Sequence, residues 1–187
     1  MGENGTRLLA QAREGDIEAF AEFVRMFERR VRAVLGRLLD DERDVDEAAQ
    51  DTFVQAWRNL DRFRGDAAPF TWLYRIAVNE ALQRVRRKRL DTRPLPDVEE
   101  ARTSPAPRAR GSDAEAEEHE ELAFLADRIR ALDFDLRAPL VLRDVEGLSN
   151  QEVADALGLT VPAAKSRIHR ARMQLRQEFQ EWRGQPG

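Results

Sequence analysis

One segment near the carboxyl end of the chain carries start and stop signals for two helices separated by a very short connection. Ser149 and Glu152 have the spacing of a capping box, in which a hydroxyl and a carboxylate each bond a backbone amide at a helix start. Gly158 stands where a left-handed residue ends a helix, and Thr160 with Pro162 opens the next one. The sequence therefore predicts two helices joined by a turn of about three to four residues.

The second of these helices is rich in basic residues. Five of them lie between Lys165 and Arg176, and no acid occurs from 161 to 177. Apolar residues from Ala164 to Leu175 recur at helical spacing, so they should face the core. This layout indicates a DNA-reading helix-turn-helix, with a merely solvated basic helix as the alternative. The residues expected to face or flank DNA are Pro162, Ala163, Lys165, Ser166, His169, Arg170, Arg172, Met173 and Arg176.

The rest of the chain has helical periodicity and no alternating strand pattern. Apolar residues keep one face of a long helix after Asp16 and of two further helices before position 90. Large apolar residues are nearly absent from 91–118, and such a stretch cannot bury enough surface to offset its ordering entropy. We predict an all-α chain with small helical domains at 1–90 and 119–187, the second a helix-turn-helix four-helix domain, joined by a flexible linker.

Composition narrows the chemistry of the chain. It has no cysteine and two histidines, which excludes a disulfide framework and a thiol nucleophile and leaves little for zinc. No apolar run is typical of a signal segment or a membrane span, so we expect a cytoplasmic protein without membrane insertion. No cluster of carboxylates and histidines favours catalysis, and we therefore expect no enzyme activity, metal or cofactor.

Charge is unevenly distributed along the chain. The net charge is −4, but seven acids lie between Asp40 and Asp51, while Arg84, Arg86, Arg87, Lys88, Arg89 and Arg93 form a basic cluster. Two partners of opposite charge are indicated, one anionic and one that accepts an acidic surface.

The segment 61–70, DRFRGDAAPF, leads into a helix in which aromatic and basic residues are interleaved. Rings that stack on bases and guanidinium groups that hold the backbone suit single-stranded nucleic acid. Trp57, Trp72 and Tyr74 at helical spacing are also typical of a core. The residues alone leave both interpretations open.

Taken in order, these blocks resemble the sigma factors of bacterial RNA polymerase. DVDEAAQDTFVQAWRNLDRFRG and FTWLYRIAVNEALQRVRR precede the linker, and LVLRDVEGLSNQEVADALGLTVPAAKSRIHRARMQLR follows it. The chain is similar to the compact extracytoplasmic-function (ECF) group, which has only the two conserved domains. The resemblance covers nearly all of the chain apart from the linker and the ends. It implies an initiation factor that directs core polymerase to promoters by reading their minus-ten and minus-thirty-five elements.

The resemblance also implies partners and roles. The partners are core RNA polymerase, through its beta-prime clamp and beta flap, promoter DNA and an anti-sigma factor. The clamp-docking face would consist of Asp44, Asp46, Gln50, Asp51, Val54 and Arg58. The minus-ten reader, with one flipped base in a pocket and arginines on phosphates, would consist of Phe63, Arg64, Phe70, Trp72, Arg75, Ile76, Ala77, Asn79, Arg84, Arg86 and Arg87. The minus-thirty-five reader would consist of Pro162, Ala163, Lys165, Ser166, Arg167, His169, Arg170 and Met173.

Two residues depart from the family pattern. Ala48 stands where a larger aliphatic is usual and could weaken the clamp contacts, and Gln83 stands where aspartate is common. A regulator that binds an operator as a homodimer through the same helix-turn-helix is the alternative function, and it would need a self-complementary apolar face.

Overall fold

The computed structural model describes residues 2–63, 65, 68–91 and 113–184, and every regular element within them is helical. The all-α prediction is therefore confirmed. The elements are α1 (Gly2–Arg13), α2 (Ile17–Leu38), α3 (Glu42–Arg58), the 3₁₀ turn η1 (Leu60–Arg62), α4 (Pro69–Asp91), α5 (Asp113–Ala131), α6 (Phe134–Leu140), the π-helical turn η2 (Val141–Val145), α7 (Asn150–Leu157) and α8 (Val161–Arg183).

Most of the predicted linker, 91–118, lies outside the described residues. Its last part differs from the prediction, because 113–118 belongs to α5. The absence of large apolar residues there suggested a linker, but its alanines and glutamates are strong helix formers.

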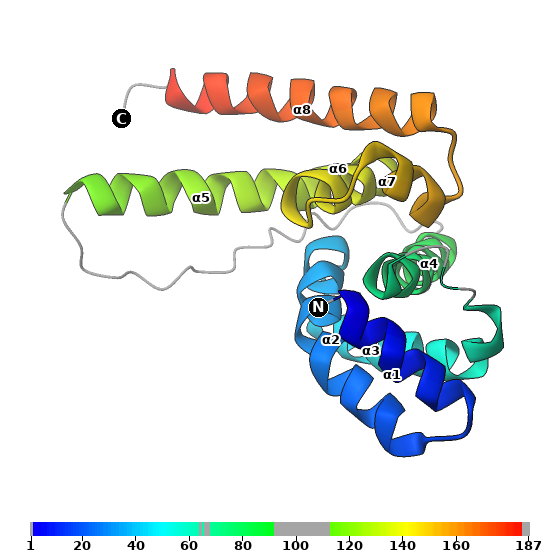
Figure 1. Cartoon of the computed structure of the whole chain (residues 1–187). Helices are drawn as coiled ribbons and strands as arrows, with labels where there is room; N and C mark the ends of the chain where they lie inside the picture. The colour runs from blue at the N-terminus through cyan, green and yellow to red at the C-terminus, as the bar shows by residue number, and fades with distance from the viewer. Residues whose placement is uncertain (1, 64, 66–67, 92–112, 185–187) are drawn as a thin grey trace.

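Helices α1 to α4 form one group, which occupies the lower half of Figure 1. Its core is centred on α2, whose apolar stripe includes Phe23, Phe27 and Val31, each at most 1% exposed. Asp16 begins this helix, since its carboxylate accepts a bond of 3.0 Å from the Ala19 amide.

Helix α1 was not anticipated from the sequence. Its apolar face consists mainly of Leu8 and Leu9, which is too short a stripe to give a periodic signal, yet both are buried. Gly5 lets this helix approach the core closely, because a Cβ there would lie 3.2 Å from the Phe27 ring. Tertiary packing therefore supports a helix that local pattern alone does not reveal.

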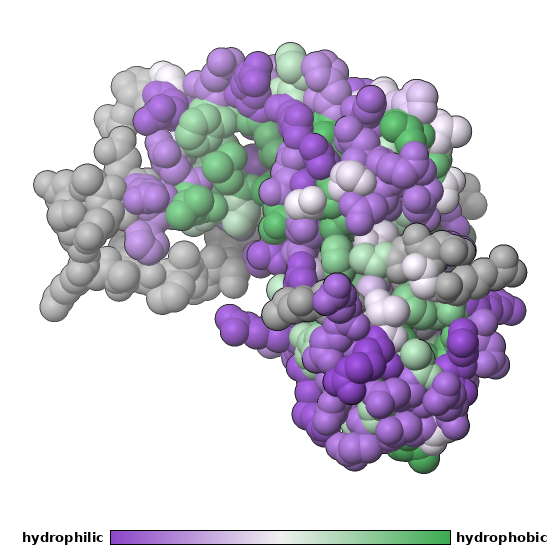
Figure 2. Space-filling view, viewed as in Figure 1, coloured by the Kyte–Doolittle hydropathy of each residue, from purple (hydrophilic) through white to green (hydrophobic). Residues whose placement is uncertain are grey.

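Helices α5 to α8 form the second group, in the upper half of Figure 1, where α5 and α8 extend side by side away from the first group. Phe124 of α5 stacks on Trp182 of α8 with ring centroids 4.7 Å apart, and Arg183 pairs with Glu121 at 2.9 Å. Figure 2 shows hydrophobic residues gathered between these two helices. The contact explains why α8 continues to Arg183, beyond Leu175, the last residue of the predicted apolar face.

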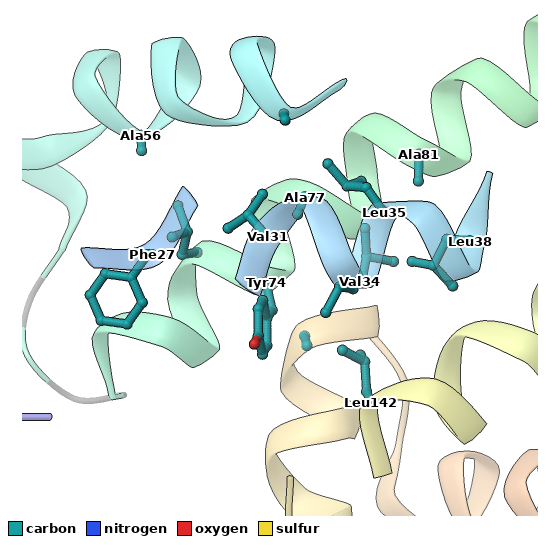
Figure 3. Packing of buried hydrophobic residues seen from close by; sticks show 14 of the residues in the cluster. Phe27, Val31, Val34, Leu35, Leu38, Ala56, Tyr74, Ala77, Ala81 and Leu142 are labelled. Atoms are coloured by element: carbon teal, nitrogen blue, oxygen red, sulfur yellow. The ribbon is translucent and has the colours of Figure 1, made fainter. Parts of the chain in front are cut away.

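The two groups are in contact and share one buried apolar cluster. In Figure 3, Leu142 of η2 points toward Val34 of α2, on the side of that helix where Tyr74 also lies. Leu142, Val34 and Tyr74 are each fully buried. The second group therefore rests on α2 and α4 in this structure.

Candidate nucleic-acid and polymerase interfaces

The helix-turn-helix forms with the predicted signals. Ser149 Oγ accepts a bond of 3.2 Å from the Glu152 amide, and Glu152 Oε2 accepts one of 2.8 Å from the Ser149 amide. Gly158 ends α7 in the left-handed region with φ of 62°, and Thr160 caps α8 through the Ala163 amide at 3.3 Å. The turn thus holds α8 at a defined angle to α7.

One side of α8 faces the core and the other faces outward. Ala164, Ile168 and Ala171 are buried, as the spacing predicted, and Leu175 is partly buried. Ala163 and Arg167 are half-buried at the edges of the outer face, and its remaining predicted members are exposed: Pro162, Lys165, Ser166, His169, Arg170 and Met173. This placement suits a helix that lies in a major groove.

Arg172 was expected to flank the DNA, but its side chain is bonded to a carboxylate of the protein. Its guanidinium makes two bonds with Asp144 of η2, at 2.9 and 2.5 Å, which raise the pKa of Arg172 above its usual value. The residue is still exposed, but its charge is engaged with a carboxylate that the sequence pattern did not connect to it.

A polar hollow of about 380 Å³ lies between the carboxyl-terminal end of α3, with the turn that follows it, and the outer side of α4. It brings together four residues of the predicted minus-ten reader: Trp72, Arg75, Ile76 and Asn79. It also includes residues that the sequence analysis did not assign, namely Gln55, Asn59, Arg62, Glu80 and Gln83. The spacing of four between Gln55 and Asn59, and between Asn79 and Gln83, is the signal that could have placed these amides on common faces.

Several other residues of the predicted reader lie elsewhere. Phe63 is 8% exposed and packs beneath Trp72, with ring centroids 5.2 Å apart, so it belongs to the core. Ala77 is also part of the core: it is fully buried, because it faces α2 and α3. Phe70 lies outside the hollow, against Tyr74 and under the Arg30 guanidinium. None of these three residues lines the hollow, and their part in reading the minus-ten element stays a prediction.

Arg84 was expected to hold a strand phosphate, but it is 9% exposed and ion-paired. It contacts Asp51 at 2.5 Å and Glu80 at 3.2 Å. Burial disfavours its charge, but these carboxylates outweigh burial and leave the pKa of Arg84 raised. Because it joins α3 to α4, its role here is structural. Arg86 and Arg87 are exposed, and Arg64 lies outside the described residues.

The predicted docking face of α3 points outward, and its acidic side chains form ion pairs with basic residues of neighbouring helices. Gln50, Val54 and Arg58 are exposed. The acids are not solitary charges: Asp44 contacts Lys88 at 2.9 Å, Asp46 pairs with Arg32, and Asp51 pairs with Arg84. The acidic surface is therefore partly neutralised by α2 and α4.

An apolar hollow of about 310 Å³ lies beside this face, and the sequence analysis missed it. Trp57, for which a core position was one of two open interpretations, is 40% exposed, and Ile17 is 72% exposed. They surround the hollow with Phe20, Phe53 and Val54. Helical periodicity placed Trp57 on the apolar side, but only the packing of α2 shows that its ring lies at the rim.

The two departures from the family pattern have distinct positions. Ala48 is fully buried, so it affects the packing of α3 and does not present a surface to a clamp. Gln83 is exposed and lines the polar hollow. Among the described residues, no group of histidines and acids could hold a metal ion, and none of the helices is long and apolar enough to span a membrane.

Comparisons with known proteins agree with this arrangement. The family model for Sigma-70 region 2 matches residues 23–90, and that for Sigma-70 region 4 matches 125–175. The RNA polymerase sigma-H factor of Pseudomonas aeruginosa is 35% identical, with 91% of this chain and 91% of the relative covered. The ECF RNA polymerase sigma-E factor of Haemophilus influenzae is 31% identical, with 92% of this chain and 94% of the relative covered.

Among solved structures, CnrH in complex with the cytosolic domain of CnrY is similar, with a TM-score of 0.68 and 30% identity. The match covers 95% of this chain and 98% of CnrH. None of these matches supports the alternative of a homodimeric operator-binding regulator. The chain belongs to the sigma-70 family of RNA polymerase sigma factors, as a member of its ECF group.

Proposed function

We propose that this sigma factor, which directs core RNA polymerase to promoters, reads them with two separate surfaces. The polar hollow of α3 and α4 takes a flipped minus-ten base, and the outer face of α8 reads the minus-thirty-five element. The observation that carries this proposal is the convergence of Trp72, Ile76 and Asn79 in one hollow. A flipped base needs a surface to lie against and a group to read its edge, and these side chains offer both.

We further propose that the group α1 to α4 and the group α5 to α8 are separate domains, the second of which begins at Asp113. Docking on polymerase uses the exposed side of α3 with Gln50 and Val54, and the adjoining ring of Trp57 takes part. The chain has no catalytic role of its own in this proposal and works with polymerase in the cytoplasm. The complex of CnrH with the cytosolic domain of CnrY supports a comparable protein regulator for this chain, an anti-sigma factor.

Transcription in vitro with core polymerase on a library of random promoters tests the proposal and yields the recognised sequence. On the selected promoter, Asn79→Ala should keep normal stability and polymerase binding. It should lose open-complex formation on duplex DNA and base preference at one non-template position. A premelted bubble should restore opening without restoring the preference, because the cost of unpairing has already been met.

Gln180→Ala, which removes an exposed amide of α8 far along the chain from the hollow, is the matched control. Permanganate footprinting on duplex and bubble templates gives the readout. Wild-type opening and preference in Asn79→Ala would eliminate the hollow as the base pocket.

Gln50→Lys tests the docking face, and it leaves the Asp51 pair with Arg84 intact. It should weaken co-purification with core polymerase while helicity and melting temperature stay unchanged. Gln180→Lys adds the same charge elsewhere and should bind normally. Equal binding by both variants would remove this side of α3 from the docking surface.

A further inference from the structure

The end of α3 holds one amide side chain in a single orientation at the polar hollow. Asn59 closes this helix, and its Nδ2 donates a bond of 2.7 Å to the Gln55 carbonyl. The backbone amide of Asn59 bonds the same oxygen at 3.0 Å, and its own carbonyl accepts a bond of 2.9 Å from the Arg62 amide. Asn59 is half-buried and lines the hollow. Both its backbone and its side chain are therefore fixed.

This orientation determines what Asn59 offers to a ligand. A carboxamide has one NH2 donor group and one carbonyl acceptor, and a backbone carbonyl only accepts. The NH2 group is therefore the half that faces the Gln55 carbonyl, and Oδ1 is left for another partner. Within the described part of the chain, no group donates a bond to this Oδ1. Asn59 thus brings a fixed hydrogen-bond acceptor to the wall of the hollow.

Glu80 of α4 adds a second acceptor to the same hollow. It is 8% exposed, and Arg84 pairs with its Oε2 at 3.2 Å. The paired carboxylate stays ionised and has no hydrogen to donate. The other amides of the hollow, those of Gln55, Asn79 and Gln83, are not fixed by any side-chain bond among the described residues. The hollow therefore combines fixed acceptors with amides that can turn to suit a ligand.

Fixed acceptors distinguish two classes of base. Adenine and cytosine carry an amino group next to a ring nitrogen that accepts, whereas guanine and thymine carry a keto oxygen next to a ring N–H. The amino group of a flipped base donates to Asn59 Oδ1, and its ring nitrogen accepts from the NH2 group of Asn79. A keto oxygen in the same place faces another acceptor and leaves both oxygens without a donor, which lowers affinity.

We propose that Asn59 determines the specificity of this pocket, which selects an amino base, adenine or cytosine, over a keto base at the flipped minus-ten position. The Glu80 carboxylate acts in the same direction, because its negative charge repels a keto oxygen and attracts an amino group. The inference rests on the proposed function, because it concerns the base that the hollow takes.

A purely structural role for Asn59 has to be separated from base reading. Its side chain satisfies a carbonyl at a helix end, as a cap does, and losing this bond affects stability. A structural defect weakens binding to every base alike. The decisive quantity is therefore the ratio of the affinities for an amino base and for its keto counterpart, because a general loss of folded protein leaves this ratio unchanged.

Deaminated bases provide matched keto counterparts. Deoxyuridine in place of deoxycytidine, and deoxyinosine in place of deoxyadenosine, exchange the amino group for a keto oxygen with almost no change in size. Each non-template position of the selected minus-ten element is tested in turn on a premelted bubble template, where base pairing does not contribute. Competition binding by the holoenzyme gives the ratio. At one position, wild type should bind the keto template roughly ten- to hundredfold more weakly.

Two variants of Asn59 separate the acceptor from the cap. Asn59→Ala removes the acceptor and should bind the amino and keto templates alike at that position. Asn59→Asp loses the bond to the Gln55 carbonyl but keeps an acceptor oxygen, so it should retain the preference for the amino base even where its melting temperature falls. Gln180→Ala, on the exposed side of α8, is the control and should keep the wild-type ratio. Loss of the ratio in Asn59→Asp as well would show that the acceptor oxygen does not read the base.

The inference and the proposed function fail in different ways. If Asn79→Ala loses opening and base preference while Asn59→Ala keeps every ratio, the hollow remains the base pocket and the role of Asn59 is overturned. If neither variant changes a ratio at any position, the hollow is not the pocket and both proposals are overturned. A keto base selected at the position that Asn79→Ala affects would also overturn the preference inferred from Asn59.

Discussion

The two helical groups differ in how much of their core is their own. The first group, α1 to α4, buries a continuous stripe of large residues along α2, with α1, α3 and α4 packed around it. The second group has a separate cluster of only three buried residues, Leu132, Leu140 and Ala171. Its other buried residues, such as Leu142 and Val153, belong to the cluster shared with the first group. The helix-turn-helix group therefore depends on its neighbour for part of its stability.

The largest expected effect tests this dependence. Leu142→Ala removes a fully buried side chain from the shared cluster and should destabilise the chain by about 2–5 kcal/mol. Urea unfolding should be followed in variants that keep only Trp72 or only Trp182, which report on the first and second group. Both signals should shift.

Leu132→Ala is the control for this experiment, because Leu132 lies in the small cluster of the second group. It should shift mainly the Trp182 signal. A Leu142→Ala variant in which Trp72 is unaffected would show that the two groups have independent cores.

The next prediction compares a buried, ion-paired arginine of the first group with an exposed one. Arg84→Ala leaves Glu80 buried without its cation and should cost about 1–3 kcal/mol of unfolding free energy. Arg87→Ala, one turn later and exposed, should stay within about 0.5 kcal/mol of wild type. Equal stability of the two variants in urea unfolding would contradict a structural role for Arg84.

In the second group, two exposed arginines of α8 should affect DNA binding differently, one through sequence discrimination and the other through overall affinity. Arg170→Ala should lower discrimination among minus-thirty-five sequences by about 1–3 kcal/mol, as expected for a lost base contact. Arg176→Ala should weaken all sequences alike and lower the salt slope by about 0.9, as expected for a lost phosphate contact. Competition binding at several salt concentrations measures both quantities. Uniform shifts in both variants would mean that α8 presents a different face to DNA.

The smallest effect concerns Glu152, where the two groups meet. The bond that its carboxylate accepts from the Ser149 amide lowers the pKa of Glu152 below the usual 4.5. Burial acts in the opposite direction, and the Ser149 and Thr71 hydroxyls add to the lowering. A lowered pKa in the folded state means that the carboxylate stabilises the fold above pH 4.5, and that this stabilisation is lost as the pH falls through the folded value.

Glu152→Gln should therefore cost about 0.5–1 kcal/mol at neutral pH, the range of a single helix cap at a partly exposed site. The difference from wild type should shrink as the pH is lowered from 5 toward 3 in thermal unfolding. A difference that stays constant with pH would show that the charge of Glu152 contributes nothing. Gln180→Ala, an exposed and uncharged position of α8, serves as the reference substitution.

Local signals in the sequence were sufficient wherever one element defines the feature. The capping box at Ser149, the left-handed Gly158 and the Thr160 cap predicted α7 and the start of α8, because each depends on bonds within a few residues. The buried face of α8 and the start of α2 at Asp16 were predicted for the same reason. The sequence motifs were also specific enough to indicate the sigma-factor family.

Site residues that depend on several elements were predicted less well. Periodicity indicates which side of a helix is apolar, but it does not show which neighbour covers each residue. Phe63 was predicted to face DNA but packs against Trp72, and Trp57, whose spacing was also typical of a core, lies at the rim of the apolar hollow. Arg84 was predicted to hold a phosphate, but its guanidinium is paired with Asp51, which lies 33 residues away in the chain.

The sequence by itself determined that the chain is helical, where the helix-turn-helix begins and turns, and which residues of α8 face outward. These features follow from backbone bonding and helical spacing, which act over a few residues. Only the tertiary structure decided that Asn79 shares a hollow with Gln55, that Arg84 is buried between two carboxylates, and that α4 bonds to Glu146 and Glu152 of the second group. Each of these contacts joins residues distant in the chain, and their proximity depends on how whole helices pack.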